Sequence, residues 1–101
     1  MMTKADALAR LRACEPELRQ LGIIQLSIFG STARGEQRPE SDVDLVATLD
    51  YDQVEKLGPF GFFGIEDQIA AMLGTKVDLV TEPTRNPRLQ AEIDRDRVHV
   101  F

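Results

Sequence analysis

The sequence has little of what disulfide, thiol or membrane chemistry requires. It contains one cysteine and no tryptophan in 101 residues. A lone cysteine cannot form an internal disulfide, and Cys14 has no histidine near it in sequence, so we interpret it as a packed helix residue. No apolar stretch is long enough to cross a bilayer or to form a secretory leader, so we expect a cytoplasmic protein without membrane contacts.

Basic residues are also scarce. The chain has 12 lysine and arginine residues against 17 aspartate and glutamate residues, which gives a net charge of -5. Nucleic-acid binding depends on neutralising phosphates with basic side chains, so we expect no direct binding of DNA or RNA. With 43% hydrophobic and 29% charged residues, the composition is that of a globular protein, and the length predicts one domain over residues 1–101.

The first part of the chain has the pattern of an amphipathic helix. Its apolar positions recur three or four residues apart, at Leu8, Leu11, Cys14, Leu18 and Leu21. Thr3 is a suitable N-cap, Pro16 should divide the segment into two pieces, and Gly22 should end it. A second helical pattern covers residues 65–73 and a helical turn covers residues 89–93, while residues 51–64 suggest a loop or a short helix.

Four short segments have the pattern of strands, and they cover residues 23–29, 42–49, 77–80 and 98–101. The strand patterns alternate with helical ones, without an internal repeat or a low-complexity linker. The sequence therefore predicts an α/β (α+β) fold in which helices flank a small mixed β-sheet.

Three aspartates stand in these strand patterns. Successive side chains of a strand point to opposite faces, so Asp42 and Asp44 should project on the same side, about 7 Å apart along the chain. Because two like charges on one face repel, a structural role predicts either a compensating Lys or Arg or a divalent cation. Hard oxygen ligands favour Mg²⁺ or Mn²⁺ as that cation. Asp78 lies between apolar neighbours in a third strand, and we expect it to complete the site.

Gly30 and Ser31 follow the first strand and lead into Thr32-Ala33-Arg34. Glycine permits close approach of the backbone, and free amides together with a serine hydroxyl can hold phosphate oxygens. The segment is not a Walker A loop, because no Gly-Lys-Ser/Thr follows, and a Gly-Ser pair alone is more often merely a turn. From the residues alone, Arg34 is assigned a solvated or structural role.

These residues together resemble a known family. Gly30-Ser31, ten further residues and then Asp42-Val43-Asp44 match the G-S-x10-D-x-D signature of the nucleotidyltransferase superfamily, which includes DNA polymerase beta and the aminoglycoside nucleotidyltransferases. Residues 29–36 and 41–45 resemble its minimal nucleotidyltransferase (MNT) branch, and the similarity extends over most of the chain. The resemblance implies the DNA polymerase beta-like nucleotidyltransferase fold.

The resemblance also implies a chemistry, which is the Mg²⁺-dependent transfer of a nucleoside monophosphate, with ATP as the expected substrate. Asp42 and Asp44 would bind two Mg²⁺ ions, with Mn²⁺ as an alternative. Asp78 would ligate one of these ions and help to take the proton from the attacking hydroxyl. Gly30 and Ser31 would hold the triphosphate, and Arg34 would steady it.

A partner follows from the same resemblance. Members of the MNT branch are antitoxins encoded beside a HEPN-domain toxin, an RNase, so the leading hypothesis is an antitoxin that adenylylates a hydroxyl, preferably of a tyrosine, on its toxin. One alternative is an antitoxin that neutralises the toxin by binding alone. Another is a nucleotidyltransferase subunit that acts on a small molecule or RNA. Phe60, Phe62 and Phe63 are expected in the core or on a partner-facing patch.

Overall fold

The computed structural model describes residues 2–58 and 61–101, apart from the side chains of Phe62 and Phe63. The expectation for Phe60, Phe62 and Phe63 thus lies outside what is described. None of the helices in the described ranges is both long and apolar enough to cross a membrane. The elements, in chain order, are α1 (Lys4–Ala13), α2 (Glu15–Gln20), β1 (Ile23–Phe29), α3 (Gly30–Arg34), β2 (Val43–Leu49), α4 (Tyr51–Lys56), α5 (Gly61–Leu73), β3 (Val77–Thr81), α6 (Pro87–Asp96) and β4 (Val98–His99).

The N-terminal segment with the amphipathic pattern forms two helices, α1 and α2, as Pro16 predicted. Thr3 caps α1 with a reciprocal pair of hydrogen bonds, in which its hydroxyl accepts from the Asp6 N–H at 3.1 Å and the Asp6 carboxylate accepts from the Thr3 N–H at 3.3 Å. The two helices are separated at Cys14. Pro16 lies in the first turn of α2, where the backbone N–H that proline lacks would have no partner within the helix.

The four strands form a mixed sheet in the order β3-β2-β1-β4. β1 runs antiparallel to both β2 and β4, whereas β2 and β3 are parallel. The antiparallel register sets Phe29 opposite Asp44, and the parallel register sets Asp44 opposite Asp78. The predicted mixed sheet with flanking helices is confirmed, and its pairing brings two carboxylates onto adjacent strands.

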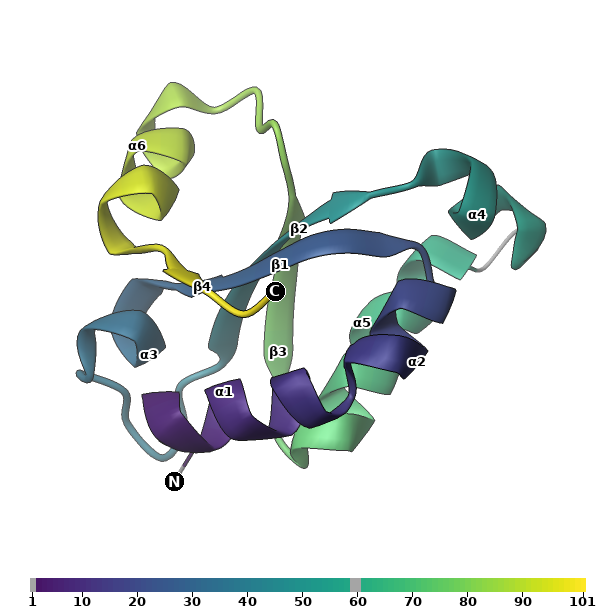
Figure 1. Cartoon of the computed structure of the whole chain (residues 1–101). Helices are drawn as coiled ribbons and strands as arrows, with labels where there is room; N and C mark the ends of the chain where they lie inside the picture. The colour runs from purple at the N-terminus through teal and green to yellow at the C-terminus, as the bar shows by residue number, and fades with distance from the viewer. Residues whose placement is uncertain (1, 59–60) are drawn as a thin grey trace.

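The two faces of the sheet are covered by different helices (Figure 1). The larger core joins one face to α1, α2 and α5, and its fully buried members include Leu11, Leu18, Leu26, Ile28, Leu45, Ile65, Ile69 and Leu73. On the other face, Phe29 and Val46 pack against Ile93 of α6. Because side chains alternate along a strand, Asp44 shares the face of Val46, so α6 and Asp44 lie on the same side of the sheet.

Several element boundaries differ from the prediction. β3 extends to Thr81 rather than ending at Val80, and β4 ends at His99 rather than at Phe101. β2 begins at Val43, so Asp42 lies immediately before the strand and not within it. α5 begins at residue 61 rather than 65. α6 begins at Pro87 and is ten residues long instead of a single turn, because the Asn86 side chain accepts hydrogen bonds from the first backbone N–H groups and caps the helix.

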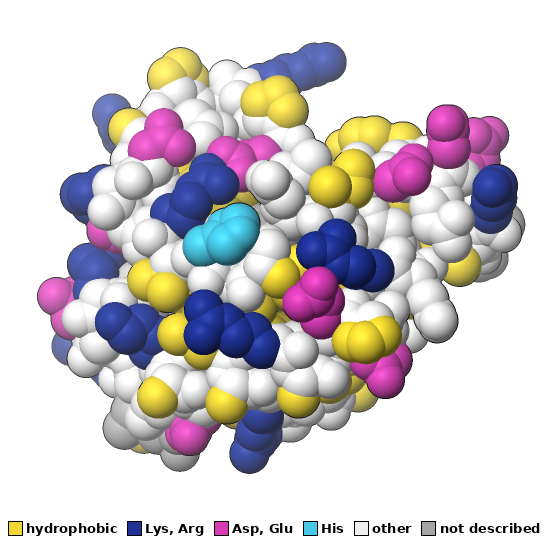
Figure 2. All heavy atoms as spheres, viewed as in Figure 1, with side chains coloured by type: hydrophobic (Ala, Val, Ile, Leu, Met, Phe, Trp, Pro, Cys, Tyr) yellow, Lys and Arg dark blue, Asp and Glu magenta, His cyan; other side chains and the backbone are white. Residues whose placement is uncertain are grey.

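The C-terminal segment is held by basic side chains of the two N-terminal helices. The Arg12 guanidinium donates to the carbonyl oxygens of Val100 and His99, each at 3.1 Å. The Arg19 guanidinium lies over the Phe101 ring, 4.7 Å from its centroid. Figure 2 shows Lys and Arg side chains gathered on this face of the molecule, several of them around the histidine. These two arginines thus anchor the terminal strand in an otherwise acidic chain.

β3 lies at one edge of the sheet, where α5 meets it. The Glu66 carboxylate of α5 accepts a hydrogen bond from the Leu79 N–H at 3.1 Å. A backbone donor of an edge strand is thereby satisfied by a side chain and not by a further strand.

Candidate active site

Asp44 and Asp78 lie next to each other in the candidate site. β2 and β3 pair Asp44 directly with Asp78, and neighbouring strands are about 4.8 Å apart. Asp44 is partly buried, whereas Asp78 is exposed. The structure therefore brings together two of the three aspartates that the sequence analysis assigned to the site.

Gly30 lies against the Asp44 carboxylate. A Cβ atom built on Gly30 would lie 2.3 Å from Oδ2 of Asp44, which is far closer than any van der Waals contact allows. Gly30 also has a φ of +70°, in the left-handed region that favours glycine. Both the space and the backbone conformation therefore require glycine here, and the start of α3 is fixed beside the acidic pair.

The electrostatic surroundings of Asp44 disfavour its charged form. Burial raises the pKa of Asp44 to about 6, with further contributions from the negative charges of Asp78, Glu92 and Asp42, while Arg34 acts in the opposite direction. A carboxylate that titrates this close to neutral pH is typical of functional sites. Negative charge is therefore concentrated around Asp44 beyond what the nearby arginine compensates.

Asp42 occupies a different position from its two partners. It is exposed and lines a hollow of about 370 Å³ with residues of the segments that precede β2 and β3, namely Pro39, Glu40, Ser41, Thr75 and Lys76. It stands two residues before Asp44, and because it precedes β2, its projection on the same side of the chain stays a prediction. It is also one of the charges that raise the pKa of Asp44, so it contributes to the same acidic region.

In the described part of the chain, the acidic region has the donor chemistry, but not the convergent geometry, of a divalent-cation site. Within residues 2–58 and 61–101, no three His, Cys, Asp or Glu side chains are gathered into a group that could hold a metal ion. Carboxylates without a counter-ion repel one another, so they do not converge by themselves. Their uncompensated charge and their hard oxygen donors fit Mg²⁺ or Mn²⁺. Metal binding by Asp42, Asp44 and Asp78 stays a prediction, and it would require the side chains to turn toward one another.

Ser31 lies in the first turn of α3, directly after Gly30. Its side chain is partly exposed, while the next residue, Thr32, is buried. The Ser31 carbonyl accepts the Glu36 N–H at 2.8 Å, which closes the turn behind the short helix. The turn is therefore held by buried and hydrogen-bonded neighbours, with the serine at the surface. The assignment of Gly30 and Ser31 to a triphosphate stays a prediction.

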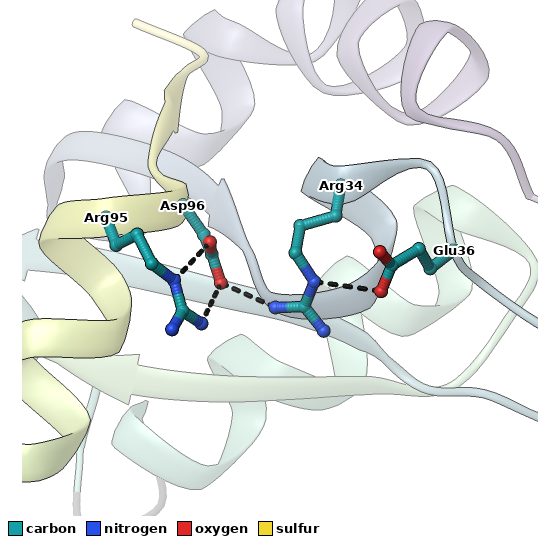
Figure 3. A network of polar contacts seen from close by, with 4 residues as sticks. All are labelled: Arg34, Glu36, Arg95 and Asp96. Atoms are coloured by element: carbon teal, nitrogen blue, oxygen red, sulfur yellow. Dashed lines mark hydrogen bonds and ion pairs between the residues drawn. The ribbon is translucent and has the colours of Figure 1, made fainter.

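Arg34, the last residue of α3, is engaged in ion pairs. Its guanidinium donates to the Glu36 carboxylate at 3.0 Å and to the Asp96 carboxylate at 2.6 Å (Figure 3). Arg95 donates to the same Asp96 carboxylate at 2.9 and 3.0 Å. The bonds to Glu36 and then to Asp96 raise the pKa of Arg34 above its ordinary value. The structure thus gives Arg34 a structural role, and its contact with nucleotide stays a prediction.

Two acidic residues near the site were missed by the sequence analysis, Glu92 and Asp96. Both belong to α6, and their spacing of four residues places them on one flank of the helix beside the buried Ile93. Asn86 followed by Pro87 is a helix-start signal that would have extended the predicted turn towards its N-terminus, whereas its extension to Asp96 has no such signal. Their approach to α3 and Asp44, in contrast, results from the packing of α6 on the sheet and has no local signal.

Comparison with known proteins agrees with this architecture. Residues 11–98 match the family model described as a nucleotidyltransferase domain. The chain is 32% identical to the protein adenylyltransferase MntA of Thermococcus cleftensis over 101 residues, which cover 99% of this chain and 98% of that protein.

Solved structures show the same fold. A minimal nucleotidyltransferase superposes with a TM-score of 0.77 at 28% identity, covering 97% of this chain and 96% of that one. An MNT antitoxin in complex with the tri-AMPylated HEPN toxin of Shewanella oneidensis is matched with a TM-score of 0.62, covering 93% of this chain and 71% of that one; at 15% identity, this likeness concerns the fold alone. The chain therefore belongs to the nucleotidyltransferase family and, within it, to the MntA-type protein adenylyltransferases.

Proposed function

We propose that this chain is the Mg²⁺-dependent antitoxin of a toxin–antitoxin pair, and that it transfers AMP from ATP to a hydroxyl group of its partner toxin. The observation that carries the proposal is the pairing of Asp44 with Asp78 directly beside the Gly30 turn. Metal-assisted transfer of a nucleoside monophosphate requires carboxylates that hold the cation and, beside them, backbone N–H groups that bind phosphate oxygens. The similarity to MntA along nearly its whole length supports AMP as the transferred group.

Each residue of the site has a proposed role. Asp42 and Asp44 hold the cations, and Asp78 shares in holding one of them. The backbone of Gly30 and the hydroxyl of Ser31 bind the triphosphate, because Gly30 lets the turn approach closely and Ser31 is at the surface. When bound, Mg²⁺ polarises the phosphoryl oxygens and offsets their negative charge.

The transfer itself is a displacement at the α-phosphorus of ATP. The acceptor oxygen forms a bond to this phosphorus, and the bond to the bridging oxygen breaks, so that pyrophosphate leaves. The proton of the acceptor hydroxyl passes to the carboxylate of Asp78, which is exposed and can be reached by another molecule. The protein contributes mainly positioning and electrostatic stabilisation.

The proposed acceptor is a hydroxyl, preferably of a tyrosine, on a HEPN-domain toxin. A net charge of -5 disfavours an RNA acceptor. A protein partner would also cover the site, align its hydroxyl for attack and exclude water. The structure of an MNT antitoxin with an AMPylated HEPN toxin supports this choice, because that protein shares the fold of this chain.

The proposal is tested by incubating the purified chain with labelled ATP, Mg²⁺ and the product of the adjacent reading frame, followed by intact-mass spectrometry. We expect one or more AMP groups on that product and none after chelation of Mg²⁺. Asp44→Asn should abolish the transfer. Asp94→Asn, at an exposed acidic position of α6, is the matched control and should retain it.

Other outcomes select the alternatives. Tight association without label would indicate an antitoxin that acts by binding alone. Label found only on RNA or on a small molecule would reject the protein acceptor.

A further inference from the structure

Asp96 is a half-buried residue whose carboxylate is covered by two arginines at the surface of the protein. Its side chain is 4% exposed. Oδ2 accepts from Arg34 at 2.6 Å and from Arg95 at 3.0 Å, and Oδ1 accepts from Arg95 at 2.9 Å (Figure 3). The two guanidinium groups that donate to this carboxylate also shield it from water, and such charge-assisted hydrogen bonds are stronger than neutral ones. The contact with Arg34 is therefore specific and not a chance surface pair.

This contact joins two parts of the chain that are 62 residues apart in sequence. Asp96 is the last residue of α6, and Arg34 is the last residue of α3. α6 is itself fixed on the sheet by the buried Ile93. Asp96 is thus a rigid support for α3 that comes from outside the turn.

The support acts on a short element with little tolerance for movement. α3 is only five residues long, and Gly30 at its start leaves no room for even a Cβ atom beside Asp44. A displacement at Arg34 is therefore transmitted to Gly30 and Ser31 within little more than one helical turn.

We infer that Asp96 is a positioning residue, which holds Arg34 and through it fixes the Gly30–Arg34 segment beside Asp44. The inference deepens the proposed function and rests on it for the role of that segment in ATP binding. Glu36, the other carboxylate on Arg34, does not provide this support. It is 66% exposed and only two residues away in sequence, so its pair with Arg34 stabilises little.

A matched pair of variants tests the inference. Asp96→Asn removes the charge that holds Arg34, with little change in shape. Glu82→Gln is the control, because Glu82 pairs with Arg97 at the same end of α6 but links it to the end of β3 and not to α3. Both variants weaken an ion pair at the C-terminal end of α6.

The first measurement is amide hydrogen exchange of residues 30–36 in the full chain without nucleotide. We expect Asp96→Asn to speed this exchange on the order of tenfold, because the segment loses its outside support, and Glu82→Gln to leave it unchanged. If Asp96→Asn does not fold, Arg34→Gln removes the same contact and should have the same effect on exchange. Equal exchange in all variants and the wild type would overturn the inference.

The second measurement is the steady-state transfer of AMP to the toxin with ATP as the varied substrate. We expect Asp96→Asn to raise the KM for ATP about tenfold while kcat changes less, because a displaced segment binds the triphosphate poorly. A lowered KM would contradict the inference, since it would mean that Asp96 withholds Arg34 from the nucleotide. Absence of transfer by the wild type would reject the proposed function, and the exchange measurement would still decide the role of Asp96.

Discussion

At the scale of single residues, Asp44 is held where its charge costs the fold energy. It is paired with Asp78 across two strands, partly buried, and crowded by the turn at Gly30. Proteins retain such arrangements where function requires them, because a residue selected only for stability would avoid them. The charge of Asp44 should therefore lower the free energy of unfolding at neutral pH.

Asp44→Asn should remove a pH-dependent loss of stability. The pKa of Asp44 in the folded chain, about 6, lies above its ordinary value of 3.8, so the folded state holds this proton more tightly than the unfolded state. The stabilisation from the protonated form is complete below about pH 3.8 and is lost as the pH rises through about 6. After screening by solvent, we expect Asp44→Asn to be more stable than the wild type near pH 7 by about 1 kcal/mol or less.

Urea unfolding at a series of pH values measures this difference. It should shrink towards pH 4, and Asp94→Asn should track the wild type throughout. A difference that is constant across the pH range would show that Asp44 does not titrate as described.

Gly30→Ala should impair function more than stability, and Gly35→Ala supplies the comparison. Both glycines have positive φ values, +70° and +74°, so alanine costs about 1–3 kcal/mol of strain at either position. Only at Gly30 does the added methyl group meet another group, the Asp44 carboxylate, which must then rotate away. We expect similar melting temperatures for the two variants, with AMP transfer lost only in Gly30→Ala. Equal activities would show that the position of the Asp44 carboxylate is not critical.

At the scale of elements, local patterns predicted the strands well and the helix ends less well. Ile23–Phe29 was predicted with its observed bounds, because alternation and a following glycine are both local signals. The extent of α6 was underestimated, although Asn86 and Pro87 mark its start. The parallel pairing that sets Asp44 beside Asp78 could not be predicted from spacing, since it depends on how α5 returns the chain to the sheet. The motif therefore predicted the candidate site residues, and tertiary packing determined their neighbours.

Ile93→Ala should test how strongly α6 supports the site. Ile93 is fully buried against Phe29 and Val46, so truncation should cost about 2–5 kcal/mol of unfolding free energy. Leu57→Ala, at a residue that is 42% exposed, should change stability by no more than about 0.5 kcal/mol. Chemical denaturation of both variants provides the measurement. A small effect of Ile93→Ala would mean that α6 is only loosely attached to the sheet.

At the scale of the whole molecule, the charge of the chain and the charge of the site have the same sign. The net charge is -5, and burial together with the negative charges of Asp78 in β3, Glu92 in α6 and Asp42 before β2 raises the pKa of Asp44. An acidic site in an acidic protein attracts cations and repels free polyphosphates. Bound Mg²⁺ is therefore expected to be a precondition for ATP binding as well as for the reaction.

Mg²⁺ should raise the melting temperature of the wild type, because a ligand that binds only the folded state stabilises it. The gain is about 2.7 kcal/mol when the free ion is at 100 times its Kd. The shift should be much smaller in Asp44→Asn and intact in Asp94→Asn, both measured by differential scanning calorimetry at constant ionic strength. An equal shift in both variants would place the ion elsewhere on the protein, and no shift at millimolar Mg²⁺ would indicate a degenerate site.

The hydrogen bond from the Leu79 N–H to Glu66 has a consequence for the behaviour of the chain in concentrated solution. β3 ends the sheet on one side, and a bare strand edge is a template on which other chains can polymerise. The carboxylate already occupies a donor of that edge, and its charge repels a second copy that carries the same residue. Asp78 can therefore remain exposed on an edge strand without making that strand a starting point for aggregation.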